Sequence, residues 1–319
     1  MTATAGCLVS AVLTSKTGYM INLKIINHRR LWLALSGVMV AASIVFLLMW
    51  GLKFGLDFTG GSLLELKFNG GQASVSAVQE KLTGVAVSSL TIQPSEESMI
   101  LRFQESDEAS HQAVLAALKT LPEAQLGMEE IRFEAIGPSI GQELRSKAFW
   151  LMFFVLIVII VYIAFTFQRV SKPVASWKYG VIAVVALFHD LLITLGVFSL
   201  LGRFYGVEIN TTFVVALLTV LGYSVNDTIV VFDRTRENLP KSTTNFAETV
   251  NNSLNQTFVR SINTVITTLL ALLAVLFFGG DSVRDFVLAL IIGIFCGAYS
   301  SIFVASPLLV VWERWQSRR

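Results

Sequence analysis

Hydrophobic residues gather along this chain into long runs, each close to the ~20 residues that a helix needs to cross the apolar core of a bilayer. The fifth run is the shortest, and the last is long enough to tilt or to extend beyond the bilayer. We therefore predict a polytopic α-helical membrane protein with six transmembrane helices, at Leu31–Trp50, Ala148–Phe167, Tyr179–Leu201, Ile209–Phe232, Ile262–Phe278 and Phe286–Trp312.

The composition agrees with this pattern. Hydrophobic residues make up 54% of the chain and charged residues only 14%, which excludes an ordinary soluble domain. The net charge of +2 and the lack of a basic cluster interleaved with aromatics give no sign of nucleic-acid binding. Tryptophans form an aromatic belt at the predicted membrane boundaries, at Trp32, Trp50, Trp150, Trp177, Trp312 and Trp315.

The orientation follows from lysine and arginine in the short loops. One side of the predicted membrane holds fourteen of these residues, whereas the other side holds only Arg203 and Arg284. The positive-inside rule then makes both termini cytoplasmic. The tails at 1–30 and 313–319 and the segment at 233–261 are cytoplasmic in this reading, and the long loop at 51–147 is exported.

The loop at 51–147 has the pattern of a small α+β domain. Its element order, β-α-β-β-α-β, is that of a ferredoxin-like fold. It contains neither a paired set of carboxylates nor a nucleophile triad, so we do not expect catalysis there. The predicted strands are Ser62–Phe68, Val85–Gln93, Met99–Phe103 and Glu129–Ala135, and the predicted helices are Ser74–Leu82, with Ser74 as N-cap, and Asp107–Leu121.

Two glycine-marked motifs join this domain to the membrane. GLDFTGG follows the first run and IGPSIG precedes the second. Glycine permits backbone conformations that are closed to other residues, so we predict tight turns at both junctions. We expect a structural role for Asp57, Gly60, Gly61, Gly137, Pro138 and Gly141.

The fourth run contains Asn226 and Asp227 well inside its apolar sequence. A carboxylate at that depth costs about 3 kcal/mol or more unless it faces protein or water or is protonated. Helical spacing puts Thr219, Tyr223 and Asp227 on one face. We therefore expect Asp227 to point into a helix bundle, toward a partner charge or a file of waters. A structural hydrogen bond between helices is the alternative.

Other polar residues occur in neighbouring runs. His189 and Asp190 lie near the middle of the third run, where a hydrogen-bonded pair across helices and a proton relay are equally compatible with the sequence. Arg260 precedes the fifth run, with Thr264 one turn later. Arg260 either extends to the headgroups or approaches Asp227 and keeps it ionised.

Two weaker patterns complete the membrane region. Phe246–Phe258 is typical of a short amphipathic helix lying along the interface. Gly293-x-x-x-Gly297 in the last run permits close packing of helices. The two cysteines, Cys7 and Cys296, indicate neither a disulfide framework nor a metal site.

These motifs, in this order from about Met20 to Arg319, resemble the SecD/SecF family of bacterial protein-export membrane proteins, on its SecF side. The resemblance covers GLDFTGG, IGPSIG, the HD pair, GYSVNDTIVVFDRTREN and the arginine before the fifth run. It implies half of a resistance–nodulation–division transporter in the bacterial inner membrane.

The resemblance also implies partners and a mechanism. SecD would supply the other six spans, and the pair would associate with the SecYEG channel and YajC. It would use the proton motive force to move preproteins after the SecA step, with no bound cofactor. In the family, the residues at the positions of Asp227, Arg260 and Thr264 are linked to proton passage, so the resemblance implies a role in a proton pathway for these three. We add Asn226 and Asp190 to this predicted pathway as neighbouring polar residues. The coupling ion, proton or sodium, stays open.

Two other functions compete with this interpretation. The first is an intramembrane aspartyl protease with Asp190 and Asp227 as its dyad, although Val225-Asn226-Asp227 lacks the Gly-x-Gly-Asp pattern of such enzymes. The second is a scaffold that only stabilises a channel complex, which gives no reason for Asp227. We expect a transporter subunit and not an enzyme.

Overall fold

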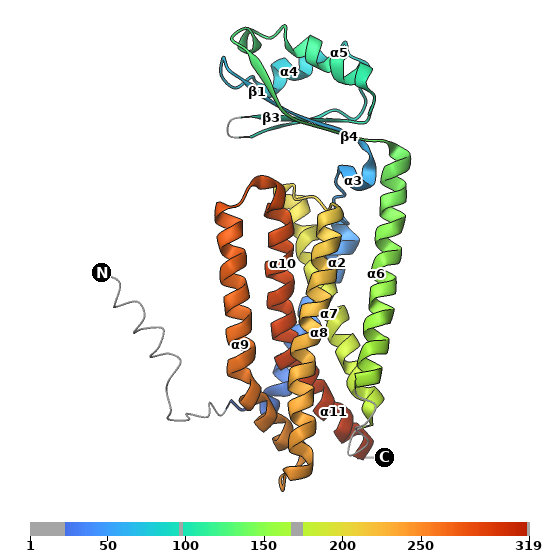
Figure 1. Ribbon diagram of the computed structural model, residues 1–319, viewed down its shortest axis with the longest axis vertical. Helices are drawn as coiled ribbons and strands as arrows, with labels where there is room; N and C mark the ends of the chain where they lie inside the picture. Colours follow the sequence, from blue (N-terminus) through green and yellow to red (C-terminus); the bar gives the residue numbers. More distant parts are fainter. Residues whose placement is uncertain (1–22, 96–97, 167–174, 318–319) are drawn as a thin grey trace, which may run out of the picture.

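The computed structural model describes residues 23–95, 98–166 and 175–317. Within these residues six helices are long and apolar enough to cross a membrane, as predicted. They form an upright bundle, and a domain containing the β-sheet sits at one end of it (Figure 1). Most of the predicted N-terminal tail lies outside the described residues.

The bundle consists of long helices joined or flanked by short helical turns. After a short 3₁₀ turn, η1 (Ile26–His28), its helices are α2 (Arg29–Trp50), α6 (Pro138–Thr166), α7 (Ser176–Tyr205), α8 (Thr211–Asn238), α9 (Phe246–Phe278) and α10 (Asp281–Ser300). The 3₁₀ turn η3 (Leu239–Lys241) follows α8, and α10 continues through the π-helical turn η4 (Ser301–Ala305) into α11 (Ser306–Ser317).

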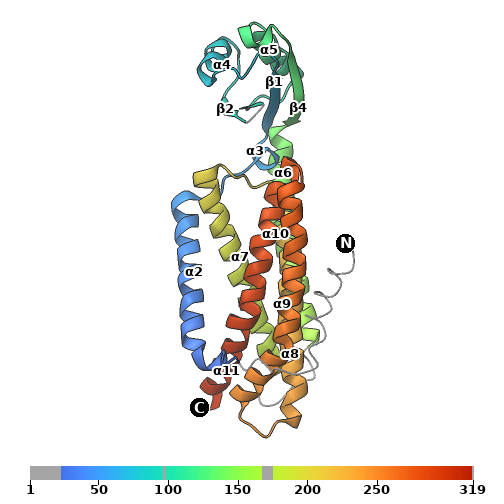
Figure 2. The same ribbon diagram turned by 90° about the vertical axis from the view of Figure 1, so that its left-hand side faces the viewer.

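Three spans form the centre of the bundle. In their most apolar stretches, 61% of α7, 56% of α8 and 67% of the α10–α11 span are buried, against 11% or less in α2, α6 and α9. Figure 2 shows α2 and α9 on opposite sides, with α7 and α10 between them. The outer helices therefore leave much of their surface for lipid or for another protein.

Two helices of the bundle differ from the sequence prediction. Helix α6 begins at Pro138 instead of Ala148, because proline suits the first turn of a helix and IGPSIG starts that helix instead of ending in a turn. Phe246–Phe258 is not a separate interfacial helix. It is the first part of α9, which contains neither glycine nor proline and is capped by Asn245, whose side chain accepts from the Glu248 amide at 3.0 Å.

The domain that contains the β-sheet, predicted to be exported and called the exported domain below, has the predicted ferredoxin-like order. Its strands are β1 (Gly61–Phe68), β2 (Thr91–Pro94), β3 (Met99–Phe103) and β4 (Met128–Ile136), and its helices are α4 (Val75–Leu82), α5 (Glu108–Leu118) and the 3₁₀ turn η2 (Pro122–Ala124). The sheet is antiparallel, in the order β2-β3-β1-β4. Strand β2 is shorter than predicted because the backbone turns over residues 85–90, where Ser89 has φ 56°.

The sheet has one covered and one open face. Leu64, Leu66, Met99 and Leu101 are fully buried beneath α4 and α5. The alternate residues point toward the bundle, because a strand directs successive side chains to opposite faces. In Figure 1 the helices lie above the sheet and the bundle lies below it. The open face therefore looks onto the ends of the membrane helices.

Candidate functional site

Asp227 lies on the inner side of α8 and is 8% exposed. Its Oδ1 accepts a hydrogen bond of 2.6 Å from the Ser261 hydroxyl of α9. Its Oδ2 is buried and has no hydrogen-bond partner among the described residues. The prediction that Asp227 points into the bundle is confirmed. A buried oxygen without a partner is costly, so Oδ2 is the atom where a proton would be bound most favourably.

The helix packed against this part of α8 departs from α-helical geometry near Asp227. Thr228, the next residue, is hydrogen-bonded through its Oγ1 to the Ser301 Oγ at 2.9 Å. Ser301 opens the π-helical turn η4, and the Ser306 hydroxyl donates to the Ser301 carbonyl at 3.2 Å. Single π-helical turns inside α-helices are frequent at functional sites. Asp227 thus lies between Ser261 of α9 and a helix that departs from α geometry.

Arg260 and Thr264 lie on the outer surface of α9, and both are exposed. The Thr264 hydroxyl donates to the Arg260 carbonyl at 2.9 Å. Within the described residues, Arg260 forms no ion pair with Asp227, and its neighbour Ser261 takes the position facing that carboxylate. The structure of this single chain therefore does not show the expected approach of Arg260 to Asp227.

The exposed surface of α8 and α9 carries further polar groups. Tyr223 is half-buried and its hydroxyl lies 3.3 Å from the Thr268 hydroxyl, so the predicted polar face is divided between bundle and surface. Polar groups on the outside of a membrane span normally face protein or water. The exposed set is Thr219, Asn226, Arg260, Asn263, Thr264 and Thr267.

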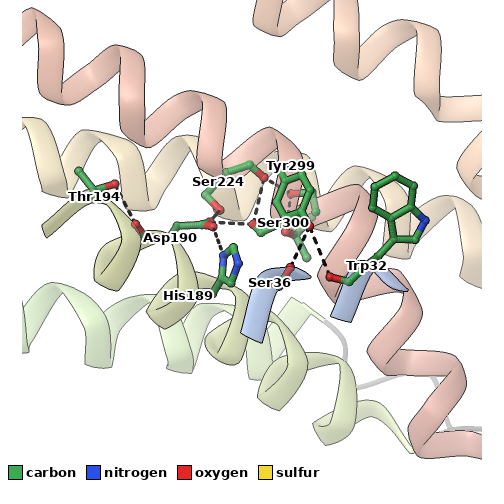
Figure 3. A network of polar contacts seen from close by, with 11 residues as sticks. Trp32, Ser36, His189, Asp190, Thr194, Ser224, Tyr299 and Ser300 are labelled. Carbon is green, nitrogen blue, oxygen red and sulfur yellow. Dashed lines mark hydrogen bonds and ion pairs between the residues drawn. The ribbon is translucent and has the colours of Figure 1, made fainter. Parts of the chain in front are cut away.

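Asp190 is fully buried and joins the three central helices (Figure 3). Its Oδ1 is 3.0 Å from His189 Nδ1 on the same helix, α7. Its Oδ2 accepts from Ser224 of α8 at 2.6 Å and from Ser300 of α10 at 2.8 Å. The hydrogen-bonded alternative for this pair is thus observed. Asp190 and Asp227 share no hydrogen bond, so the shared-proton pair of an aspartyl protease is not formed.

The same network reaches the first span. The Tyr299 hydroxyl lies 3.0 Å from the Ser36 hydroxyl and donates to the Trp32 carbonyl at 3.4 Å, both in α2 (Figure 3). The Tyr299 ring stacks on His189, with centroids 6.1 Å apart. The network therefore connects α2, α7, α8 and α10.

The GLDFTGG and IGPSIG residues meet at the top of the bundle, away from Asp227. Asp57 is in the short helix α3 (Leu56–Thr59) and accepts from Thr211 at the start of α8. A Cβ on Gly60 would lie 2.9 Å from the Pro138 Cα, and one on Gly141 would lie 2.9 Å from the Gly60 nitrogen. Gly61 has φ 110°, whereas open space surrounds Gly137, where the structure gives no reason for glycine.

A polar cleft of about 640 Å³ separates the open face of the sheet from the ends of α7, α8 and α10. Arg102 of β3 crosses it and forms an ion pair with Glu208, in the loop between α7 and α8. Lys53 lies 3.2 Å from the same carboxylate. The exported domain is thus held to the membrane end by charge as well as by its two chain connections.

Sequence reasoning missed the partners of both buried carboxylates. Ser224 and Ser261 provide hydroxyls that face Asp190 and Asp227 from neighbouring helices, and Tyr299 connects the first span. The sequence gives no specific signal for these partners, because serine is common in membrane helices.

Two family models match the chain. The model of the protein export membrane protein SecD/SecF, C-terminal, matches residues 117–315, and the SecD/SecF GG motif matches residues 46–71. The second match contains Asp57, Gly60 and Gly61. The first contains Asp190, Asp227 and their hydroxyl partners.

Curated relatives are similar over nearly the whole chain. The protein translocase subunit SecF of Thermobaculum terrenum is 39% identical, over 91% of this chain and 93% of its own length. SecF of Rhodothermus marinus is 40% identical, over 91% of this chain and 92% of its own length. SecF of Synechocystis sp. is 39% identical, over 82% of this chain and 84% of its own length.

Two solved structures share the fold. The crystal structure of SecDF from Thermus thermophilus, described as a translocon-associated membrane protein, aligns with a TM-score of 0.77 and 32% identity. That alignment covers 92% of this chain and 39% of the SecDF chain. SecDF in a super-membrane-facing form aligns with a TM-score of 0.67 at 32% identity, over 93% of this chain and 39% of that chain. The chain thus spans well under half of a SecDF protein.

Proposed function

Since the chain belongs to the SecD/SecF family and is a multi-pass protein translocase subunit, not an enzyme, we propose that it couples ion movement at Asp227 to preprotein export. The observation that carries the proposal is the geometry of this carboxylate. Asp227 is buried at mid-span, one oxygen accepts from Ser261, and the other has no hydrogen-bond partner within the part of the chain that the structure describes.

The physical step is a change in the charge of one buried group. The ionised carboxylate requires hydrogen-bond donors and attracts cations. The protonated carboxyl group requires fewer donors and attracts cations less strongly. The two forms therefore favour different packing of α8 against α9 and against η4, whose Ser301 is bonded to Thr228. One charge that crosses the membrane potential releases about 2.3 kcal/mol per 100 mV, enough to shift a two-state equilibrium by more than tenfold.

A second six-span subunit would complete the transporter. This chain spans 39% of the SecDF chain and exposes polar side chains on α8 and α9, including Asn226, Arg260 and Thr264. Covering that surface with protein would remove it from lipid, and we propose a SecD-type chain as the partner. In such a pair, Arg260 and Thr264 would line the ion path from the interface side.

The remaining assignments follow from the family and the charges. We propose the bacterial inner membrane as the location, with both termini cytoplasmic, since lysine and arginine gather on that side. The proposed further partners are the SecYEG channel, YajC and the translocating preprotein. We propose a proton as the coupling ion, because the buried Oδ2 of Asp227, which has no hydrogen-bond partner among the described residues, can bind a proton directly.

The test is Asp227→Asn in the assembled complex, reconstituted in vesicles with a controllable membrane potential. The substitution keeps the shape but removes the titrating group, so potential-driven stimulation of preprotein export should fall to the level without potential. Asp233→Asn is the matched control, because it is the same aspartate-to-asparagine substitution at the exposed end of α8. There Asp233 pairs with Arg236 at 2.6 Å. Full stimulation with Asp227→Asn would refute the proposal.

A further inference from the structure

We infer that Asp57 is a positioning residue that couples movement of α8 to the exported domain. The inference rests on the proposed function, because it takes α8 as the helix that responds to ion binding at Asp227. It concerns a different end of that helix, where the membrane bundle meets α3 and β1. In this inference, movement of α8 reaches the exported domain through a side-chain contact as well as through the two segments of chain that connect the domain to the bundle.

Asp57 binds the first residue of α8. Its Oδ2 accepts from the Thr211 backbone amide at 2.7 Å and from the Thr211 hydroxyl at 2.5 Å. The helix already has its own cap, since Asn210 Oδ1 accepts from the Phe213 amide at 2.9 Å. The Asp57 carboxylate is therefore an additional anion at the positive end of the helix dipole, supplied from a distant part of the chain.

The backbone reinforces this contact. The Gly55 amide donates to the Ile209 carbonyl at 2.7 Å, and the Ile209 amide donates to the Lys53 carbonyl at 2.8 Å. These two bonds form a short parallel bridge between Phe54 and Ile209. The segment at 53–57 is thus attached to the segment at 209–211 by backbone and side-chain bonds together.

Helix α3 is in turn packed tightly against the exported side. Gly60 and Gly141 are in backbone contact distance, so α3 and the start of α6 approach as closely as glycine allows. A Cβ on Gly61 would lie 2.6 Å from the Phe103 carbonyl of β3, which fixes the start of β1 against the sheet. Phe58 is buried in the hydrophobic core of the bundle. Displacement of Thr211 would therefore move α3, and α3 would move β1.

Thr211 and Asp227 lie on one continuous helix, roughly 24 Å apart along its axis at 1.5 Å per residue. In this inference, α8 transmits an axial shift or rotation along this length. No other contact of the described junction joins the α8 helix itself to α3 through a charged group. The Asp57–Thr211 contact is thus a route from the α8 helix itself, through α3, to the exported domain.

The experiment compares two readouts on the reconstituted complex, proton conductance and potential-driven preprotein export. Asp57→Ala should leave proton conductance unchanged and reduce export stimulation about tenfold, the effect of losing a charge-assisted hydrogen bond. Thr211→Val keeps the backbone amide and the branched shape but removes the hydroxyl, so it should give a smaller loss of export with unchanged conductance. Thr211→Ser keeps both donors and should behave like the unsubstituted chain.

Two results would overturn the inference. Either export stimulation is unaffected in both Asp57→Ala and Thr211→Val, or conductance and export fall together, which is the behaviour of a residue of the ion path or of a damaged complex. The amount of assembled complex is measured for each variant, and Thr211→Val decides if Asp57→Ala fails to assemble. Asp227→Asn in parallel should abolish both readouts, so a failure of the proposed function is recognised separately.

Discussion

At the scale of single residues, the two buried carboxylates of the bundle differ in how well they are satisfied. Asp190 accepts from Ser224 and Ser300 and contacts His189, and it is completely inaccessible. Asp227 accepts from Ser261, and its Oδ2 has no hydrogen-bond partner among the described residues, although the Ser301 side chain lies close to the same carboxylate. A fully satisfied group fixes a structure, whereas a partly satisfied one can change its state. We therefore propose a structural role for Asp190 and the responsive role for Asp227.

The structural role of Asp190 predicts that two substitutions at this position destabilise the bundle to different degrees. Asp190→Ala leaves two buried hydroxyls, of Ser224 on α8 and Ser300 on α10, without their carboxylate acceptor, so it should lower the free energy of unfolding by about 1–3 kcal/mol. Asp190→Asn keeps one accepting oxygen and should lose less. Thermal unfolding in detergent measures both variants. Equal stability of Asp190→Ala and the unsubstituted chain would show that the network does not stabilise the bundle.

The sequence alone could identify Asp227 but not its neighbours. A carboxylate within an apolar run is visible because its cost in a membrane is high. Ser261 and Ser224 carry no such signal, since serine is common in membrane helices. The position of Arg260 shows the same limit, because a rotation of about 100° between adjacent helical residues decides whether Arg260 or Ser261 faces the carboxylate.

At the scale of elements, the close approach of α8 and α10 holds the site together. A Cβ on Gly293 would lie 2.3 Å from Val220 Cγ2, and one on Gly297 would lie 2.8 Å from Ser224 Cβ. The predicted role of Gly293-x-x-x-Gly297 in close packing is confirmed. This proximity lets Ser300 and Ser224 reach the same carboxylate oxygen of Asp190.

Substitution at this contact should be costly. Gly293→Val places two methyl groups against the stiff side chain of Val220, so α10 must move away from α8, with a loss of about 1–3 kcal/mol in the free energy of unfolding. Gly37→Ala in α2 is the control, because nothing lies within 4 Å of the added Cβ. Thermal unfolding of both variants measures the difference. Similar unfolding temperatures for the two would contradict the packing argument.

The elements themselves were largely predictable, and their ends were not. Apolar runs located all six spans because spanning length is a strong signal. The start of α6 was misplaced because Gly137 and Pro138 were interpreted as a turn, although proline also begins helices. The interfacial helix expected at Phe246–Phe258 is part of α9, because an amphipathic pattern does not determine the direction in which a helix runs.

At the scale of the whole molecule, the exported domain and the bundle are separated by a polar cleft that an ion pair crosses. Arg102 of β3 pairs with Glu208 at the membrane end, and Lys53 lies beside it. The sequence could not reveal this pair, since its members are far apart in the chain and unremarkable in composition.

Loss of this pair should loosen the domain. Glu208→Gln removes the charge that Arg102 and Lys53 share, so the distance between the sheet and the end of the bundle should become longer and more widely distributed. Spin labels on β4 and on the outer end of α9 report that distance. Glu134→Gln is the matched control, because its partner Arg132 is on the same strand, at 2.5 Å. An unchanged distribution for Glu208→Gln would show that the ion pair does not hold the domain.

The most direct test of the central claim is infrared difference spectroscopy of the reconstituted complex during a pH jump. The carbonyl stretch of a protonated carboxylic acid reports the charge state of a buried side chain. We predict one such band in the unsubstituted complex, lost in Asp227→Asn and kept in Asp233→Asn. A band that persists in Asp227→Asn would assign the proton to another group and contradict the account.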